Sequence, residues 1–188
     1  MGDPALSPSV ENYMIGKGVL SIAKWTDGSI GEHVDVGNCP RFEYEPNEQT
    51  IEHFSSRAGT KELDKEVTIQ VGYSLNFTLD EISIENLRMF MRATLEGTNV
   101  LRMNQAINQE YAIKFVADNP VGPNVNYDFW KVKLTPNGAF SLIGEEFTTM
   151  SFSGKGLSDK TGHADSPYGE GTFVLSTTTT TTTTTTTE

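Results

Sequence analysis

The residues of this sequence that could do chemistry are few and lie far apart. The three histidines, His33, His53 and His163, occur in unrelated polar segments and lack the one-turn spacing of paired metal ligands on a helix. Asp159 and Asp165 flank His163 and could surround a cation. Loops rich in Gly, Ser and Asp commonly have this composition without binding a metal, so we expect no metal site.

Other candidates for catalysis are equally weak. Glu145 and Glu146 could be imagined as paired carboxylates, but neighbours on a strand point to opposite faces. Residues 154–158, Gly-Lys-Gly-Leu-Ser, lack the spacing of a phosphate-binding loop. Cys39 precedes Pro40 and has no basic neighbourhood that would mark a reactive thiol, so it is better interpreted as a small buried residue. We therefore expect neither catalysis nor a cofactor.

Composition limits the class of protein. The chain has 188 residues, 36% of them hydrophobic, which suits one domain of average size. Fourteen Lys and Arg against twenty-five Asp and Glu give a net charge of -11, which argues against a protein that grips nucleic acid backbones. A single cysteine excludes an intramolecular disulfide. With neither a membrane-spanning run nor a signal peptide, we expect a soluble protein made in the cytoplasm, without membrane contact.

The most informative element is the stretch 67–79, in which apolar and uncharged polar side chains alternate without interruption. The apolar set is Val67, Ile69, Val71, Tyr73, Leu75, Phe77 and Leu79; the polar set is Thr68, Gln70, Gly72, Ser74, Asn76 and Thr78. This period of two predicts a β-strand with one apolar and one polar face. At about 3.3 Å per residue the strand would be roughly 43 Å long. Because strands of compact domains rarely exceed about ten residues, we expect it to continue into an assembly larger than one chain.

The segments before this strand predict shorter strands and one unusual connection. We expect strands over 13–25 and 33–37, joined by a hairpin turn at Asp27-Gly28, and a third over 41–45 that Pro46 and Asn47 end or bend. Residues 48–66 are rich in charge. They predict either an extended β-hairpin that projects from the body or a flexible solvated insertion, since loops of this length are uncommon in compact domains.

The segments after it predict one helix and several more strands. Ile84, Leu87, Phe90 and Met91 recur at helical spacing, which predicts a helix over about 84–93 with N-cap candidates at 80–83 and a stop at Gly97. We expect strands over 110–117, 129–135, a return strand containing Phe140 and Leu142, then 145–153 and 172–175. Residues 1–12 predict an irregular arm, and 177–188, almost all threonine, a flexible tail.

A β-rich domain with one flanking helix and a long charged segment leading into an oversized strand resembles the tail tube (major tail) proteins of long-tailed bacteriophages. Four stretches between residues 13 and 153 carry the resemblance: 16–20 (Gly-Lys-Gly-Val-Leu), 54–61 (Phe-Ser-Ser-Arg-Ala-Gly-Thr-Lys), 66–79 and 82–87 (Ile-Ser-Ile-Glu-Asn-Leu). The resemblance implies a β-sandwich or barrel over residues 13–176 that completes a multi-subunit β-barrel around a channel.

The resemblance also implies a function. Hexameric rings would stack into a tube that conducts double-stranded DNA from capsid to host without binding it specifically. The tube would join a tape measure protein and tail terminator and distal tail proteins in a virion assembled in the host cytoplasm. The segment 48–66 would reach the adjoining ring through Glu52, His53, Phe54, Ser55, Arg57, Lys61, Glu62 and Asp64.

A channel for DNA would need a wall without basic groups, because these hold phosphates by releasing counterions. Suitable lumen-lining residues are Thr68, Gln70, Ser74, Asn76 and Thr78, with Glu43, Glu45 and Glu146 adding repulsive charge if their strands are neighbours.

Three other functions remain open. A tube protein of a contractile tail, injection or secretion apparatus would share the fold and carry protein cargo. A carbohydrate-binding or adhesive sandwich would cluster its exposed aromatic side chains, whereas Trp25 and Trp130 alternate with polar residues as core positions do. A small hydrolase is disfavoured by the scattered histidines.

Overall fold

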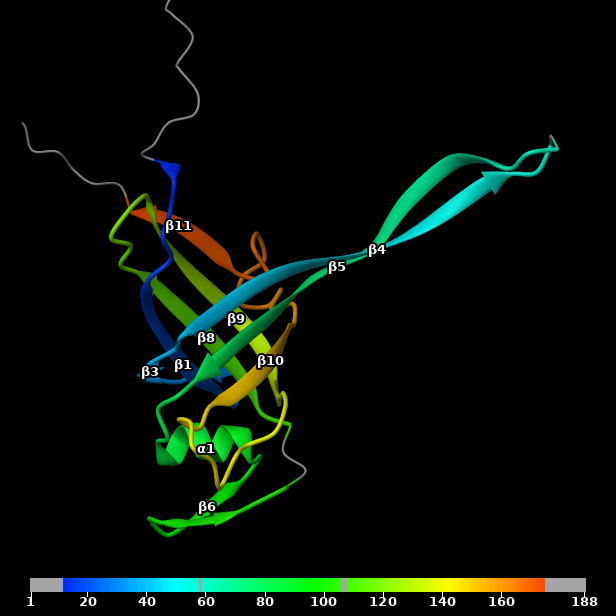
Figure 1. The fold of residues 1–188 in the computed structure, drawn as a ribbon. Helices are drawn as coiled ribbons and strands as arrows, with labels where there is room; N and C mark the ends of the chain where they lie inside the picture. Colours follow the sequence, from blue (N-terminus) through cyan, green and yellow to red (C-terminus); the bar gives the residue numbers. More distant parts are fainter. Residues whose placement is uncertain (1–11, 58, 106–107, 175–188) are drawn as a thin grey trace, which may run out of the picture.

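The computed structural model describes residues 12–57, 59–105 and 108–174. Over these residues the chain is mainly β with one short helix, as predicted (Figure 1). Its elements are β1 (Gly18–Thr26), β2 (Ser29–Ile30), β3 (Val34–Asp35), β4 (Arg41–Ser55), β5 (Glu62–Leu79), α1 (Ile84–Phe90), β6 (Thr94–Glu96), β7 (Val100–Arg102), β8 (Glu110–Ala117), β9 (Asn124–Pro136), β10 (Met150–Gly156) and β11 (Glu170–Val174). The predicted arm at 1–12, except for residue 12, and the predicted tail at 177–188 lie outside the described residues.

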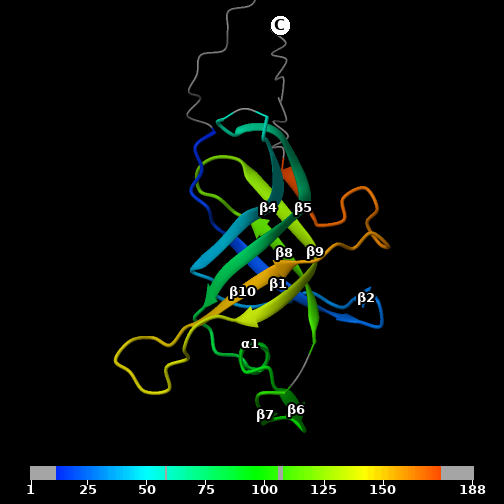
Figure 2. The ribbon, with the colours of Figure 1, turned by 90° about the vertical axis from the view of Figure 1, so that its right-hand side faces the viewer.

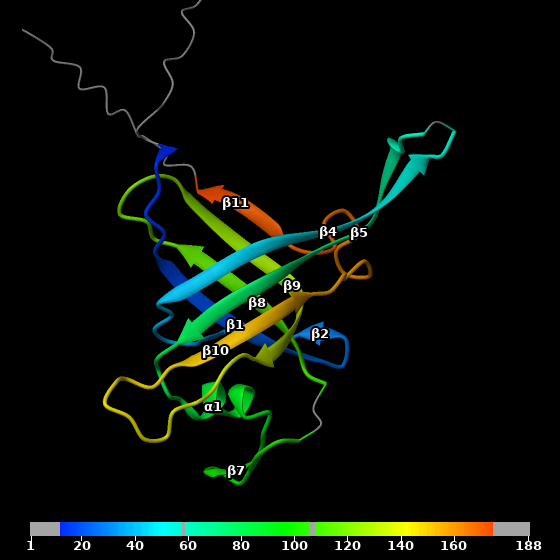
Figure 3. The same ribbon diagram turned by 45° about the vertical axis from the view of Figure 1, so that its right-hand side comes forward.

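One antiparallel sheet contains most of the strands, in the order β2-β1-β8-β9-β10-β5-β4, with β3 paired to β1 and β11 to β9. The sheet curls until β4, β5 and β10 lie across from β1, β8 and β9 (Figure 3). The contacts of Phe42 on β4 show this closure, because its ring lies 5.5 Å from that of Phe115 on β8 and 6.1 Å from that of Phe129 on β9. The result is the predicted sandwich or barrel type of fold.

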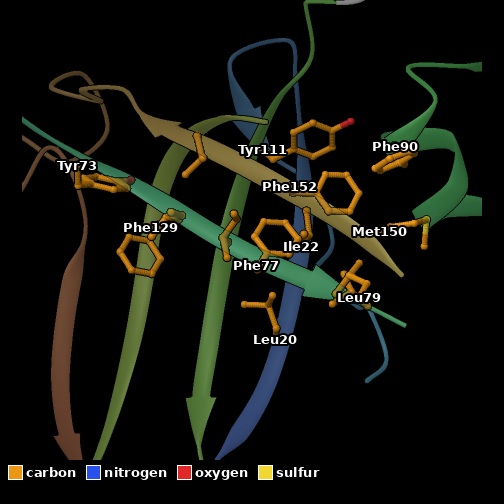
Figure 4. Packing of buried hydrophobic residues seen from close by; sticks show 14 residues of the cluster. Leu20, Ile22, Tyr73, Phe77, Leu79, Phe90, Tyr111, Phe129, Met150 and Phe152 are labelled. Carbon is orange, nitrogen blue, oxygen red and sulfur yellow. The ribbon is translucent and has the colours of Figure 1, made fainter. Parts of the chain in front are cut away.

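The core lies between these two layers (Figure 4). Its largest fully buried side chains are Leu20, Leu75, Leu79, Phe77, Ile113, Val132, Met150 and Phe152. Phe77 and Phe152 stack at 4.9 Å between ring centroids, and Phe90 of α1 meets Phe152 edge-on. Each such side chain contributes roughly 1.5–3 kcal/mol by leaving water, so the inner half of β5 is the main anchor of the fold.

The β4–β5 hairpin is longer than the sequence predicted. β4 runs through Pro46 to Ser55, and β5 begins at Glu62, so the segment 48–66 is a projecting hairpin rather than a flexible insertion. Of the two outcomes predicted at Pro46, an end or a bend, the end is wrong: β4 continues through Pro46, which an edge strand can accommodate. The Tyr168 hydroxyl donates to the carbonyl of Val71 at 3.0 Å, and beyond this contact both strands extend away from the body (Figure 1).

The helix begins as predicted and ends earlier. Ser83 is the N-cap, and its hydroxyl accepts a hydrogen bond from the Asn86 backbone N–H at 3.1 Å. The helix stops at Phe90, before the predicted end at residue 93, because Arg92 adopts a left-handed φ of 48°. The buried Asn86 side chain donates from Nδ2 to the carbonyls of Val36 at 2.8 Å and Glu81 at 3.0 Å, which joins α1 to the segment after β3.

The region between β9 and β10 corrects two predictions. Residues 137–149 form a loop, so Phe140 and Leu142 are not on a return strand, and β10 starts at Met150 rather than at residue 145. Gly138, with φ of 96°, begins this loop. β10 instead includes Gly154 and Gly156, where the ring of Tyr73 lies so close that a Cβ on Gly156 would be 2.3 Å from it. The Gly-Lys-Gly sequence thus serves packing in a strand.

We predict that Asn86→Ala lowers the free energy of unfolding by about 1–3 kcal/mol, because two carbonyl groups lose their donor and one of them is buried. Urea denaturation measures this change. Asn137→Ala, at an exposed position, is the matched control and should change stability little. Equal effects of the two variants would contradict the role given to Asn86.

Candidate functional site

Two surfaces are candidates for function, and the β4–β5 hairpin contributes to both. The first is the polar face, which is the outer side of the sheet around the inner half of β5. It consists of Arg41, Glu43 and Glu45 of β4, Ser74, Asn76 and Thr78 of β5, Ser151, Ser153 and Lys155 of β10, and Lys133 and Thr135 of β9. The second is the projecting half of the hairpin, residues 47–71.

Register makes the polar face a set of cross-strand rows. One row joins Glu43, Asn76, Ser153 and Thr135, and the next joins Glu45, Ser74, Lys155 and Lys133. Directly opposite residues of antiparallel strands project to the same side. The sequence therefore correctly placed Glu43 and Glu45 beside the uncharged side chains of β5.

The charges on this face are not only acidic, which the sequence did not reveal. Lys155 of β10 lies opposite Ser74 of β5, and Lys133 of β9 lies opposite Lys155. Two basic side chains therefore lie beside the uncharged side chains of β5. Arg41 forms an ion pair with Glu43 at 2.8 Å. The strand predicted over 145–153 ends before Lys155, whereas β10 continues to Gly156, so the sequence did not place Lys155 on this face.

Two of the predicted lumen-lining residues are not placed with the others. Glu146 lies in the loop 137–149 and not on a strand of the sheet. Thr68 points to the opposite side of the hairpin from Ser74. The Thr68 hydroxyl donates to the carboxylate of Glu48, whereas the Ser74 hydroxyl accepts from the side chain of Asn47. Asn47 and Glu48 are neighbours on β4, so their side chains point to opposite faces. A β-bulge between Gln49 and Thr50 causes the change of face. Gln70 lies before the bulge and stays on the side of Ser74.

The predicted contact residues gather at the end of the projecting half. Phe54 pairs with Leu63, Ser55 with Glu62 and Glu52 with Glu66, and His53 Nδ1 lies within hydrogen-bonding distance of the Asp64 carboxylate. Arg57 and Lys61 lie in the connection between the two strands. Ile51, Phe54, Leu63, Val67, Ile69 and Val71 all expose between 43% and 56% of their surface. The hairpin therefore presents apolar side chains to water along its whole projecting length.

An open groove of about 670 Å³ lies beside the start of β4. Its walls include the rings of Phe42, Tyr44, Phe115 and Phe129, together with Cys39. The Cys39 thiol donates to the carbonyl of Arg41 at 3.2 Å, and burial raises the pKa of this thiol. A raised pKa disfavours the thiolate, the reactive form.

The histidine that was considered as a metal ligand has a structural partner instead. His163 stacks on Trp130 with ring centroids 3.8 Å apart, and its Nδ1 donates to the buried carboxylate of Asp159 at 2.9 Å. This hydrogen bond lowers the pKa of Asp159. Among the described residues, no cluster of three or more His, Cys, Asp or Glu side chains could hold a metal ion. In the same residues, no helix is long and apolar enough to cross a membrane.

Comparison with known proteins gives a family. No curated protein matches the sequence significantly. The family described as "Protein of unknown function UCP028589" matches residues 13–101 and 94–172, which is most of the chain. The chain belongs to this family. The matched ranges include the whole β4–β5 hairpin and the four strands of the polar face.

Among solved structures, one match is a chain described as "Cryo-EM structure of the anti-feeding prophage (AFP) baseplate, 6-fold symmetrised". The sequences are 10% identical, the alignment covers 93% of this chain and 97% of that chain, and the TM-score is 0.46.

Asp159 generates a prediction about pH. Its pKa is lower in the folded than in the unfolded protein, so its contribution to stability is present above the unfolded pKa of about 3.9 and is lost as the pH falls through the folded pKa. Asp159→Asn should therefore lower the melting temperature at about pH 6, and the gap to the unaltered protein should shrink below about pH 4.

Thermal denaturation at several pH values measures this gap. Asp165→Asn, an exposed residue of the same loop, is the control and should show little difference at any pH. A gap for Asp159→Asn that stays constant into the acid range would contradict the role of the His163 hydrogen bond.

Proposed function

We propose that this protein is the structural subunit of a phage-type tail tube, in which hexameric rings stack and conduct double-stranded DNA. One observation carries the proposal: half of a hairpin built from strands of 15 and 18 residues extends beyond the body with its apolar side chains exposed. A two-stranded ribbon is marginally stable in water by itself. A second subunit that covers the projecting half would supply the missing packing.

The edge of the sheet supports the same proposal. Within the described residues, β4 has a hydrogen-bonded strand on one side only. An exposed edge of this length invites pairing with another chain, and closing the sheets of several subunits into one barrel removes it. The polar face would then line the channel, and the apolar side chains beneath it would form the core of each subunit.

The charges of the polar face define what such a channel would offer to DNA. Ser74, Asn76 and Thr78 carry no charge and cannot hold phosphates by counterion release. Lys133 and Lys155 could attract phosphates, but Glu45 ends the same row and Glu43 the next. The lumen would therefore carry both signs, with acidic groups opposing tight binding.

The proposal includes the setting of the protein. As a virion component assembled in the host cytoplasm, the tube would contact a tape measure protein and tail terminator and distal tail proteins. It would act without catalysis, cofactor or membrane contact.

A second candidate is the tube of a contractile tail, injection or secretion apparatus. The mixed charge of the polar face supports this second candidate, because a wall carrying Glu45 and Lys155 in one row suits a protein cargo as well as DNA. Neighbouring genes for a contractile sheath would support this candidate, and their absence would support the non-contractile tail.

We predict that removing residues 55–63 leaves the domain folded and abolishes tube growth, because the deletion shortens only the projecting half of the hairpin. Negative-stain electron microscopy at high protein concentration should show rings or tubes for the unaltered chain and no tubes for the variant, while circular dichroism shows an unchanged β signal. A strictly monomeric unaltered chain would contradict the proposed function. A variant that still forms normal tubes would contradict the role of the hairpin.

A further inference from the structure

The loop between β9 and β10, residues 137–149, exposes apolar side chains to an unusual degree. Ile143 and Phe147 are each 96% exposed and Leu142 is 81% exposed. Clustered apolar side chains of this kind mark interaction sites, because single exposed ones are common but grouped ones are not. We call residues 137–149 the apolar loop.

The apolar loop is held in a defined shape. Phe140 packs against Phe90 of α1 with ring centroids 5.6 Å apart. The Ser141 hydroxyl donates to the carbonyl of Ile143, and the Thr148 hydroxyl donates to the carbonyl of Ser141, both at 3.0 Å. The base of the loop is thus fixed to the body while its apolar side chains point into solvent, which suits presentation to a partner.

The end of the β4–β5 hairpin, residues 54–63, has a complementary chemistry. Phe54 and Leu63 form a half-exposed cross-strand pair at its base. The connection beyond them contains Arg57 and Lys61, and Glu62 follows at the start of β5, so this segment carries two basic side chains and one acidic side chain. We call residues 54–57 and 59–63 the hairpin tip; it is apolar at its base and carries a net positive charge.

The apolar loop carries the opposite charge. It contains Glu145 and Glu146 and no basic residue. The two features also lie far apart, toward opposite ends of the molecule: Figures 1 and 3 show the hairpin tip projecting to the upper right of the body, and Figure 2 shows the apolar loop at the lower left, beside α1. The tip and the loop of one subunit therefore cannot meet each other.

We infer that the hairpin tip of one subunit docks on the apolar loop of a second copy of this chain. Phe54 and Leu63 would pack against Ile143 and Phe147, and Arg57 and Lys61 would face Glu145 and Glu146. Two different patches at opposite ends make a heterologous contact, which repeats in one direction and builds stacks. The inference rests on the proposed function and names the surface of the next ring that receives the hairpin.

Charge reversal with rescue tests the ionic part of the contact between the hairpin tip and the apolar loop. Arg57→Glu with Lys61→Glu, or Glu145→Lys with Glu146→Lys, should each raise the concentration needed for tube growth about tenfold, and combining all four substitutions should restore it. Tube growth followed by light scattering gives this concentration. Glu32→Lys with Glu170→Lys, at exposed positions elsewhere, makes the same charge change as the loop reversal and is its control.

Replacing an apolar side chain of the loop tests the apolar part of the contact. Because Phe147 is almost fully exposed, Phe147→Ser should leave the melting temperature unchanged and still reduce tube growth about tenfold or more. Val100→Ser, at a half-exposed site on β7, is the control and should leave tube growth unchanged.

Cross-linking decides the pairing directly. In a Cys39→Ser background, Thr60→Cys on the tip and Glu145→Cys on the loop should together give, under mild oxidation, a ladder of disulfide-linked chains, and either cysteine alone should give none. If the unaltered chain forms tubes but the double-cysteine variant gives no ladder, or the fourfold charge variant does not restore tube growth, the inference is overturned and the proposed function still stands. Dimers formed by the Glu145→Cys variant alone would also overturn it, since they would indicate loop-to-loop contact. Absence of any assembly of the unaltered chain would contradict both.

Discussion

The structure depends on the β4–β5 hairpin, whose apolar side chains are buried in its inner half and exposed in its outer half. The inner half of β5 supplies Tyr73, Leu75, Phe77 and Leu79 to the core, where all four are buried. The outer half carries the same alternation of side chains into water, where Val71 and Ile69 are more than half exposed. Burial of the inner half fixes the direction in which the outer half projects, and exposure of the outer half leaves apolar surface that another chain can cover.

The rest of the fold positions this hairpin. β10 pairs with the inner half of β5, and the two glycines of β10 leave room for the ring of Tyr73 on β5 and the side chains of Val132 and Leu134 on β9. α1 packs on Phe152 through Phe90 and is tied to the segment after β3 by Asn86. The same α1 supports the apolar loop through Phe140. The two exposed apolar features are therefore held at opposite ends of one rigid core, an arrangement that favours contact between successive copies in one direction.

Much of this architecture could be predicted from the sequence. The unbroken alternation of 67–79 predicted β5, and the Asp27-Gly28 pair predicted the turn after β1. Both residues of that turn have a positive φ in the structure. The reversal of face at Thr68 could not be predicted, because a bulge leaves no signal in an alternating pattern. The position of Lys155 beside Ser74 depends on β10 continuing through Gly154 to Gly156, which glycine disfavours locally. Threonine and phenylalanine at 147–149 favour a strand that the loop does not form. Pairing between distant strands decides such points, and local sequence does not contain it.

The most direct measurement of the central claim is a cryo-electron microscopy reconstruction of the particles that the purified full chain forms. We predict rings of six subunits with Ser74, Asn76 and Thr78 facing a central channel, β4 paired at its free edge with a neighbouring subunit, and the hairpin crossing into the next ring. A reconstruction in which this polar face lies on the outside, or is buried between layers without a channel, would contradict the claim.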